Sequence, residues 1–213
     1  PYVTIDGILN YCQGSNTTLT ANGGVTYAWA DPLSSYTASV TVTAGTYTVS
    51  ETDVNGCTGT ATAVVTANAP TVVTIDGNPS FCSGDSTILV ASGGYNYTWD
   101  DVSNTASATI TINTAGTYTV TTTDINGCSG TASITTIINP SPIINLGVAK
   151  NSCCKDVILN PSPDTTLNYL WSSGDTTESV TIFANDSTKI NQIYTLTVTN
   201  QYGCTAIATD TVN

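Results

Sequence analysis

The chain has 213 residues, with three lysine or arginine residues against 15 aspartate or glutamate residues, no histidine and a formal net charge of -12. Its only cations are Lys150, Lys155 and Lys189, so nucleic acids, heparin-like polyanions and anionic lipids, which need a basic patch, are poor partners, and we expect no nucleic-acid binding. No apolar run approaches the roughly 18 residues of a membrane span, and we therefore expect no membrane insertion.

An internal repeat organises the chain. The segment 45–57, GTYTVSETDVNGC, returns as GTYTVTTTDINGC at 116–128 and, in divergent form, as IYTLTVTNQYGC at 193–204. Self-similarity at a fixed period is the signature of repeat architectures. We predict three domains, at 1–68, 69–139 and 140–213, of which the third is divergent.

The first copy is rich in β-branched residues, and no helical period persists over ten residues. The expected strands lie at 2–7, 17–21, 25–29, 39–42, 46–52 and 58–65. Short strands separated by turns predict an immunoglobulin-like β-sandwich, in which Trp29, Trp99 and Trp171 belong to the core. Tyr47, Tyr118 and Tyr194 then match the tyrosine corner of that fold. The second copy follows the same plan, and the proline-bearing linkers at 67–70 and 139–142 are expected to be stiff.

Seven cysteines in a lysine-poor chain indicate an oxidising compartment. In each copy one cysteine precedes the second strand and one follows the penultimate strand, so we predict one disulfide per domain. The expected pairs are Cys12–Cys57, Cys82–Cys128 and Cys153–Cys204. A closed loop of about 45 residues would stabilise so small a domain by roughly 4 kcal/mol.

The third copy contains adjacent cysteines, Cys153 and Cys154. Aligning Leu159 with Leu19 and Leu89 brings Cys153 nearer to the expected spacing, which favours Cys153 as the partner of Cys204. Cys154 is then either a free thiol or linked to another chain. Metal ligation is disfavoured, because the chain has no histidine and its paired cysteines are far apart in sequence.

Asp53 and Asp124 allow two interpretations. They would bind calcium at a domain end, or each would form a hairpin turn with side-chain hydrogen bonds and a glycine at positive φ. The turn is favoured, because few carboxylates cluster in each copy and Asn200 replaces the aspartate in the third. We predict no metal site and no cofactor, with calcium as the alternative.

We predict no enzymatic activity. Glu51 and Glu178 are the only glutamates, and no pocket-building insertion surrounds them. The absence of histidine also excludes a Ser-His-Asp arrangement.

Sugars would stack on exposed aromatic side chains. Tyr27, Tyr97 and Tyr169 each precede a tryptophan by two residues and are expected in the core. The expected surface aromatics, which lie near turns, are Tyr11, Tyr36, Tyr95 and Tyr202.

Four motifs together carry a family resemblance: C-x-G-x-x-x-x-L, GG-x-x-Y-x-W, GTYTV and TD-x-NGC. The set resembles the immunoglobulin/PKD-like repeats of Bacteroidota cell-surface proteins, including gliding-motility adhesins, over nearly all of copies one and two. The resemblance implies export by the type IX route and a repetitive stalk or filament at the cell surface, and it carries no catalytic residue. It also implies O-glycosylation at Asp-Ser or Asp-Thr sites, which are Ser86, Thr165, Thr176, Ser187 and Thr211.

The main hypothesis is therefore a non-catalytic, extracellular structural and adhesive protein. Its expected partners are neighbouring repeats, identical subunits in a fibre and possible surface glycans. The alternative, from a different class, is a carbohydrate-binding or spacer module of a secreted enzyme, with Tyr11 or Tyr95 as the sugar-binding aromatic.

Overall fold

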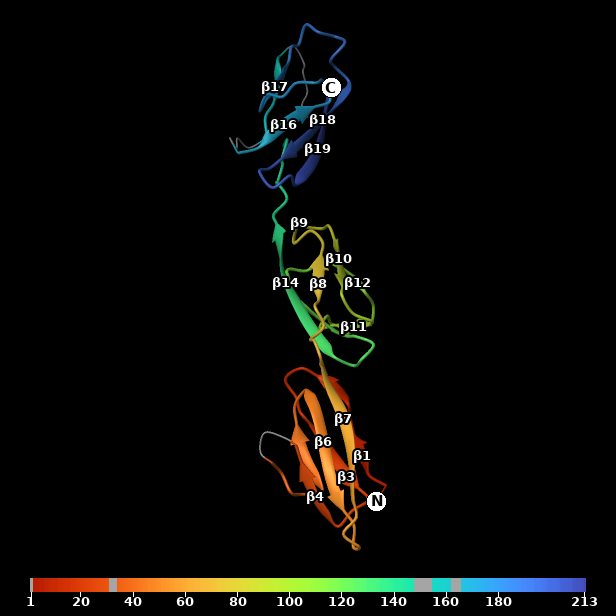
Figure 1. Cartoon of the computed structure of the whole chain (residues 1–213). Coiled ribbons are helices and arrows are strands. Elements are labelled where there is room, and N and C mark those ends of the chain that lie inside the picture. Colours follow the sequence, from red (N-terminus) through yellow and green to blue (C-terminus); the bar gives the residue numbers. More distant parts are fainter. Residues whose placement is uncertain (1, 31–33, 148–154, 162–165) are drawn as a thin grey trace. The chain divides into compact units, whose positions relative to one another are not determined.

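The computed structural model describes residues 2–30, 34–147, 155–161 and 166–213, and Figure 1 shows its strands. Within these ranges the structure contains strands and no helix. The strands are β1 (Thr4–Gly7), β2 (Asn10–Cys12), β3 (Thr17–Asn22), β4 (Thr26–Trp29), β5 (Ser39–Val42), β6 (Gly45–Thr52), β7 (Thr58–Asn68), β8 (Thr74–Asp76), β9 (Ser80–Cys82), β10 (Thr87–Ser92), β11 (Asn96–Trp99), β12 (Thr109–Ile112), β13 (Gly116–Thr123), β14 (Ser129–Asn139), β15 (Val157–Leu159), β16 (Asn168–Trp171), β17 (Val180–Ile182), β18 (Gln192–Thr199) and β19 (Thr205–Val212).

These strands form two sheets in each repeat, which confirms the predicted all-β fold of three tandem immunoglobulin-like β-sandwiches. In the first repeat the sheets have the orders β1-β3-β5 and β2-β7-β6-β4. The second repeats this pattern with β8-β10-β12 and β9-β14-β13-β11, and the third has β15-β17 and β16-β18-β19. We keep the terms first, second and third repeat for residues 1–68, 69–139 and 140–213, whose boundaries remain a prediction.

The chain divides into two compact units, and these cut across the second repeat. The first unit contains Pro1–Asp76, Val90–Ile110 and Tyr118–Ile134. The second contains Gly77–Leu89, Thr111–Thr117 and Thr135–Asn213. The complete first repeat thus lies in one unit and the complete third repeat in the other.

Alternation of apolar and polar residues along each strand builds the cores, because successive side chains point to opposite faces of a sheet. In β6, Tyr47, Val49 and Glu51 are buried, whereas Ser50 between them is exposed. The core of the first repeat gathers the side chains of Leu19, Trp29, Val40, Val49 and Val65. The core of the third repeat gathers those of Leu159, Trp171, Ile182, Leu196 and Val198.

The three tryptophans occupy the same place in each repeat, as predicted. Trp29, Trp99 and Trp171 are at most 3% exposed. Each indole N–H donates to a main-chain carbonyl, that of Thr37, Ser107 or Thr177, at 2.8 to 2.9 Å. The indole therefore fills the core while its one polar atom stays paired.

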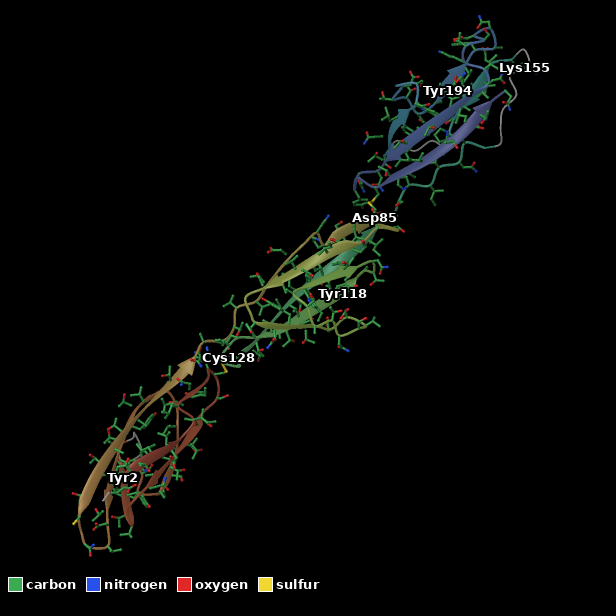
Figure 2. The ribbon with its side chains drawn as sticks, turned by 90° about the vertical axis from the view of Figure 1, so that its right-hand side faces the viewer. Tyr2, Asp85, Tyr118, Cys128, Lys155 and Tyr194 are labelled. Carbon is green, nitrogen blue, oxygen red and sulfur yellow. A yellow bond between two sulfur atoms is a disulfide. The ribbon has the colours of Figure 1, made fainter. Side chains whose placement is uncertain are left out.

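The predicted tyrosine corner is present in the third repeat. Tyr194 is buried, and its hydroxyl donates to the carbonyl oxygen of Lys189, five residues upstream, at 2.9 Å. Tyr47 in the first repeat is also buried, whereas Tyr118 in the second is only partly buried. Figure 2 labels Tyr118 and Tyr194 within their strands.

Glu51 is an exception to the apolar core. Its side chain is 0% exposed, and neither carboxylate oxygen has a hydrogen-bond partner among the described residues. The corresponding residue is Thr122 in the second repeat and Val198 in the third, and both are buried. Gly24 packs directly against this side chain, since a Cβ at Gly24 would lie 2.7 Å from the Cβ of Glu51. Burial raises the pKa of Glu51, because the charged form loses its hydration.

We predict that Glu51→Gln stabilises the protein at neutral pH, by about 1–3 kcal/mol, because it removes an unpaired buried charge without changing the shape of the side chain. A raised carboxyl pKa means that the folded chain binds the proton more tightly than the unfolded chain. The stability of the parent protein therefore falls as pH rises from about 4.3, the value of an unfolded glutamate, through the raised pKa.

The measurement is the melting temperature of both proteins between pH 3.5 and pH 8. The advantage of Glu51→Gln should grow with rising pH and vanish in acid. Glu178→Gln, at the only other glutamate, controls for the loss of one negative charge. Equal melting temperatures for the parent and Glu51→Gln at pH 7 would contradict the prediction.

Candidate functional site

Two disulfides join successive repeats. Cys12 of the first repeat is bonded to Cys128 of the second, with a Cα–Cα distance of 5.4 Å and a sequence separation of 116. Cys82 of the second repeat is bonded to Cys204 of the third, with a Cα–Cα distance of 5.6 Å and a separation of 122 residues. Figure 2 shows the first of these bonds at Cys128. We call the two sites the first and the second junction.

The predicted pairing within each repeat is therefore wrong. Cys12 is not bonded to Cys57, Cys82 is not bonded to Cys128, and the partner of Cys204 is Cys82. Cys57 is a free, exposed thiol. Cys153 and Cys154 lie outside the described residues.

Strand pairing explains why Cys12 and Cys57 do not meet. Strand β2 runs parallel to the last part of β7, and Cys12 is the register partner of Asn68, the final residue of that strand. Cys57 directly precedes Thr58, the first residue of β7. An 11-residue strand spans about 33 Å, whereas the two Cα atoms of a disulfide lie within about 7 Å. The two cysteines thus lie at opposite ends of the sandwich.

The second repeat has the same arrangement. Strand β9 runs parallel to the end of β14, where Cys82 is the register partner of Asn139. Cys128 directly precedes Ser129, at the beginning of β14. The signal that sequence analysis missed is therefore the length of the last strand, which separates the cysteine before it from the cysteine beside its end.

The loop that carries the second cysteine has the same structure in all three repeats. In the second repeat, Oδ1 of Asp124 accepts hydrogen bonds from the backbone N–H groups of Asn126 and Cys128, both at 2.8 Å. Gly127 has a φ of 79°, which glycine adopts without strain. Asp53 and Asn200 accept the equivalent bonds in the first and third repeats. We call these segments, 53–57, 124–128 and 200–204, the receiving loops.

These bonds confirm that Asp53 and Asp124 form side-chain-capped turns. One carboxylate oxygen of each aspartate accepts two backbone hydrogen bonds, and asparagine makes the same turn in the third repeat. Among the described residues no three histidine, cysteine, aspartate or glutamate side chains are placed to hold a metal ion.

At each junction a hydrogen bond joins the receiving loop to the first residues of its own repeat. At the first junction, the hydroxyl of Thr71 donates to the carbonyl oxygen of Cys128 at 2.6 Å. At the second, the side-chain amide of Asn200 donates to the carbonyl oxygen of Pro140 at 2.8 Å. Tyr202 lines a hollow of about 760 Å³ beside Cys82 and Asp85. Both junctions therefore combine a covalent bond with contacts to the chain that leads into the following repeat.

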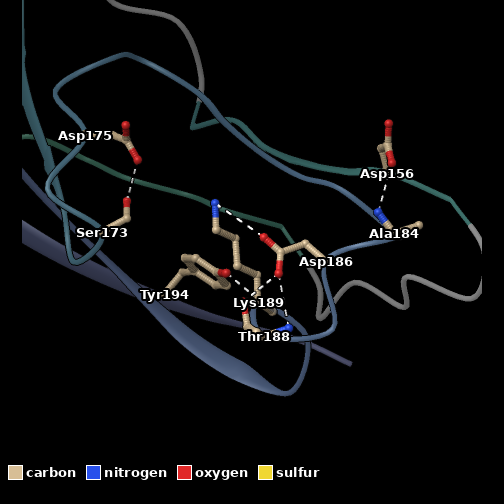
Figure 3. A network of polar contacts seen from close by, with 8 residues as sticks. All are labelled: Asp156, Ser173, Asp175, Ala184, Asp186, Thr188, Lys189 and Tyr194. Atoms are coloured by element: carbon tan, nitrogen blue, oxygen red, sulfur yellow. Dashed lines mark hydrogen bonds and ion pairs between the residues drawn. The ribbon is translucent and has the colours of Figure 1, made fainter.

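A polar hollow of about 570 Å³ lies in the third repeat, and Figure 3 shows the polar network beside it. The hydroxyl of Thr188 donates to the carboxylate of Asp186, which lowers the pKa of that carboxyl, and Lys189 lies 3.8 Å from the same carboxylate. Burial, and then the charge of Asp186, raise the pKa of Tyr194. The lining is rich in hydroxyl groups, but its single aromatic residue, Tyr194, is buried and presents no face for a sugar to stack on.

The predicted surface aromatics are confirmed in part. Tyr36, Tyr95 and Tyr202 are exposed, with Tyr95 at 74%. Tyr11 is partly buried and packs against the core of the first repeat, so it is less exposed than the other three. Tyr27 packs against the same core, and Tyr169 is buried.

The predicted glycosylation residues lie mostly at the surface. Ser86, Thr176 and Ser187 are exposed, and Thr211 is partly buried. Thr165 lies outside the described residues. Across the described chain, no helix is long and apolar enough to span a membrane.

No family model matches this chain, and no curated protein matches it. Among solved structures, a 1.5-MDa bacterial ice-binding adhesin is similar, with a TM-score of 0.37, 14% identity, and coverage of 100% of this chain and 98% of that one. Murine CEACAM1b has a TM-score of 0.34 and 18% identity, covering 65% of this chain and 100% of that one. The insect immune protein hemolin has a TM-score of 0.35 and 16% identity, covering 100% of this chain and 75% of that one. At these identities the likeness concerns the fold alone.

Removal of the first junction should destabilise the protein. We predict that the double substitution Cys12→Ser/Cys128→Ser lowers the free energy of unfolding by about 2–5 kcal/mol, because it releases a constraint on a loop of more than a hundred residues in the unfolded chain. Denaturant titration of the monomer measures this change. Cys57→Ser is the matched control, since Cys57 forms no disulfide within the described chain, and its monomer should unfold as the parent does. A junction variant as stable as the parent would contradict the prediction.

Proposed function

We propose that this chain is a non-catalytic, extracellular structural protein, and that its repeats form part of a cell-surface stalk or filament that bears tension. The observation that carries the proposal is that the disulfides join successive repeats rather than close single ones. A disulfide within a repeat stabilises only that repeat, whereas one between repeats holds neighbours together when either unfolds. Disulfides also persist in extracellular compartments and are rare in the cytosol.

The two disulfides limit how far the chain extends under tension. Three segments, 12–82, 82–128 and 128–204, all connect the first junction to the second. The shortest of them, about 46 residues long, takes the load first, and the other two remain slack. Only 1–12, 82–128 and 204–213, about 66 residue steps, then extend between the two ends of the chain. The covalent links thus prevent extension of most of the chain.

Single-molecule force spectroscopy, with handles at the two termini, tests this prediction. At about 3.5 Å per residue, the fully unfolded, oxidised protein should reach roughly 230 Å. Reduction of both junctions should release all 212 residue steps, or roughly 740 Å.

A variant with one junction provides the matched control. In Cys12→Ser/Cys128→Ser the load follows 1–82 and 204–213, about 90 residue steps, and the maximum extension should be roughly 310 Å. An oxidised parent protein that extends as far as the reduced one would reject the proposed load-bearing arrangement.

The proposal also includes the family to which the chain belongs and the glycosylation of its surface. We assign the chain to the PKD-like repeats of Bacteroidota cell-surface adhesins, exported by the type IX route, on the motifs that the first and second repeats share. We also propose Ser86, Thr165, Thr176, Ser187 and Thr211 as O-glycosylation sites. Exposed hydroxyls at Ser86, Thr176 and Ser187 support this assignment.

Intact mass spectrometry of the protein from its native source tests the glycosylation. We expect a mass above the 21.9 kDa of the polypeptide, in steps of one glycan. Peptide mapping should place the added mass at the five sites, with Ser133, which does not follow an aspartate, as the unmodified control. A mass equal to that of the polypeptide would remove the proposal.

A further inference from the structure

A polar hollow of about 760 Å³ lies at the second junction, and its lining residues all belong to the second compact unit. The lining combines Asn78, Asp85 and Asn113 of the second repeat with Tyr202 of the third. Figure 2 labels Asp85 beside this junction. Small-molecule sites in proteins have volumes of about 300–1,000 Å³. The hollow is therefore large enough to hold a small organic ligand.

Two short turns position the lining, and the disulfide ties them together. In the receiving loop, the N–H of Tyr202 donates to Oδ1 of Asn200 at 3.0 Å. In the second repeat, the N–H of Asp85 donates to the carbonyl oxygen of Cys82 at 3.0 Å. The bond between Cys82 and Cys204, with 5.6 Å between their Cα atoms, joins the two turns. The covalent link thus orders the site before a ligand arrives, which lowers the entropic cost of binding.

The polar side chains of the hollow are unpaired within the protein. No hydrogen bond joins the carboxylate of Asp85, the amide of Asn113 or the hydroxyl of Tyr202 to another described residue. The side chain of Tyr202 is 55% exposed, whereas Phe81, the other aromatic residue of the lining, is 7% exposed. One accessible aromatic face therefore lies among hydrogen-bonding groups that have no partner in the described chain.

This combination of groups suits a saccharide. A pyranose ring has apolar C–H faces that stack on an aromatic ring, and its hydroxyl groups bond to carboxylates and amides. The described lining contains no lysine or arginine, and the carboxylate of Asp85 would repel an acidic sugar or a phosphate. A purely apolar ligand would remove water from the same polar groups without replacing its hydrogen bonds. The lining thus favours a neutral, polyhydroxylated ligand.

The first junction lacks the two most distinctive groups. Its receiving loop has Asn126 at the position of Tyr202, two residues before the bonded cysteine. On the other side of the same junction, Ser15 stands at the position of Asp85, three residues after the bonded cysteine. The disulfide and the turn therefore form without the aromatic face and the carboxylate, which are particular to the second junction.

We propose that the hollow at the second junction is a saccharide-binding site, in which Tyr202 stacks on a neutral or N-acetylated pyranose ring and Asp85 and Asn113 bind its hydroxyl groups. The inference goes beyond the proposed load-bearing role, because it names a class of ligand and its site. The saccharide has two sources to distinguish, a free oligosaccharide and the glycan proposed for Ser86, which also lines the hollow. For the second source, the inference rests on the proposed glycosylation.

The first experiment titrates the isotope-labelled, unglycosylated full chain with soluble oligosaccharides and follows its backbone amide signals by NMR. The probes are cellotriose, maltotriose, mannotriose and triacetylchitotriose, with trigalacturonic acid as the acidic comparison. We expect saturable shifts at Tyr202 and Asn113 with a neutral or N-acetylated probe, at a Kd on the order of 1 mM for a site with one stacking ring. Trigalacturonic acid should cause no such shifts. Titrations in which no probe shifts these signals would overturn the inference.

Substitutions of single side chains make the test specific. Tyr202→Ala should raise the Kd about tenfold, because it removes the stacking face. Asp85→Ala should also raise the Kd, because it removes a hydrogen-bond acceptor. Tyr36→Ala is the matched control, since Tyr36 is also exposed but lies outside the hollow, and its Kd should equal that of the parent. An unchanged Kd in Tyr202→Ala would contradict the assignment.

The disulfides provide a second matched pair of variants. Cys82→Ser/Cys204→Ser should weaken binding, because the turns that carry Asp85 and Tyr202 are then no longer joined. Cys12→Ser/Cys128→Ser opens the other junction and should leave the Kd unchanged. Circular dichroism checks that both variants retain their strands. Equal binding by the parent and the folded Cys82→Ser/Cys204→Ser variant would reject a site that spans the second junction.

Protein from the native source separates the two origins of the saccharide. Saturation-transfer difference NMR detects binding of the same probe without labelling of the protein. If the glycan on Ser86 fills the hollow, the glycosylated protein should not bind the probe that the unglycosylated chain binds. If the ligand is a free oligosaccharide, both proteins should bind it alike.

Calcium chloride, added in place of the sugars, tests the competing chemistry at Asp85. Calcium that shifts the signals of Tyr202 and Asn113 when no sugar does would identify a cation site and overturn the inference. Failure of the sugar titrations would leave the force-extension prediction and the mapped glycosylation standing, because neither depends on the hollow.

Discussion

The parallel pairing of a short strand with the far end of the last strand is the constraint on which the junctions depend. Because β2 joins β7 at Asn68, the cysteine that ends β2 lies where the chain leaves the first repeat. The other cysteine lies before β7, at the opposite end of the same sandwich. A repeat built in this way cannot close its own disulfide, and in the second repeat Cys82 and Cys128 are bonded to two different neighbours. The same parallel pairing of β9 with the end of β14 places the two cysteines of the second repeat at opposite ends of that sandwich.

Sequence analysis succeeded where a pattern is local. Three features appear as expected, and each is determined by residues within a few positions of one another. They are the alternation of buried and exposed side chains along 45–52, the tryptophan that ends β4, β11 and β16, and the Asp-x-Asn-Gly-Cys turn. The disulfide pairing failed because it depends on which ends of which strands meet. Cys12 and Cys57 have the sequence spacing of a disulfide that closes a single domain. Only the register of β2 against β7 shows that the two cysteines lie at opposite ends of the sandwich.

The cores explain why each repeat is stable although its cysteines form no disulfide within it. Each repeat buries a tryptophan with its indole N–H paired, and the first and third surround it with fully buried leucine and valine side chains. Burial of such a side chain contributes roughly 1.5–3 kcal/mol, so a handful of them replaces the contribution of one internal disulfide. The covalent bonds are then free to connect repeats.

The repeats differ more in their cores than in their receiving loops. At one buried position the first repeat has Glu51, the second Thr122 and the third Val198, which span a charged, a hydroxyl and an apolar side chain. In the receiving loops, by contrast, the two side-chain-accepted bonds and the positive-φ glycine recur in all three repeats, even where Asn200 stands in place of aspartate. A sandwich core needs only apolar volume and accepts several solutions, whereas a cysteine must meet its partner within the narrow geometry of a disulfide. The junction is thus the more demanding part of each repeat, and the first repeat retains the complete loop although no neighbour within the described chain bonds to it.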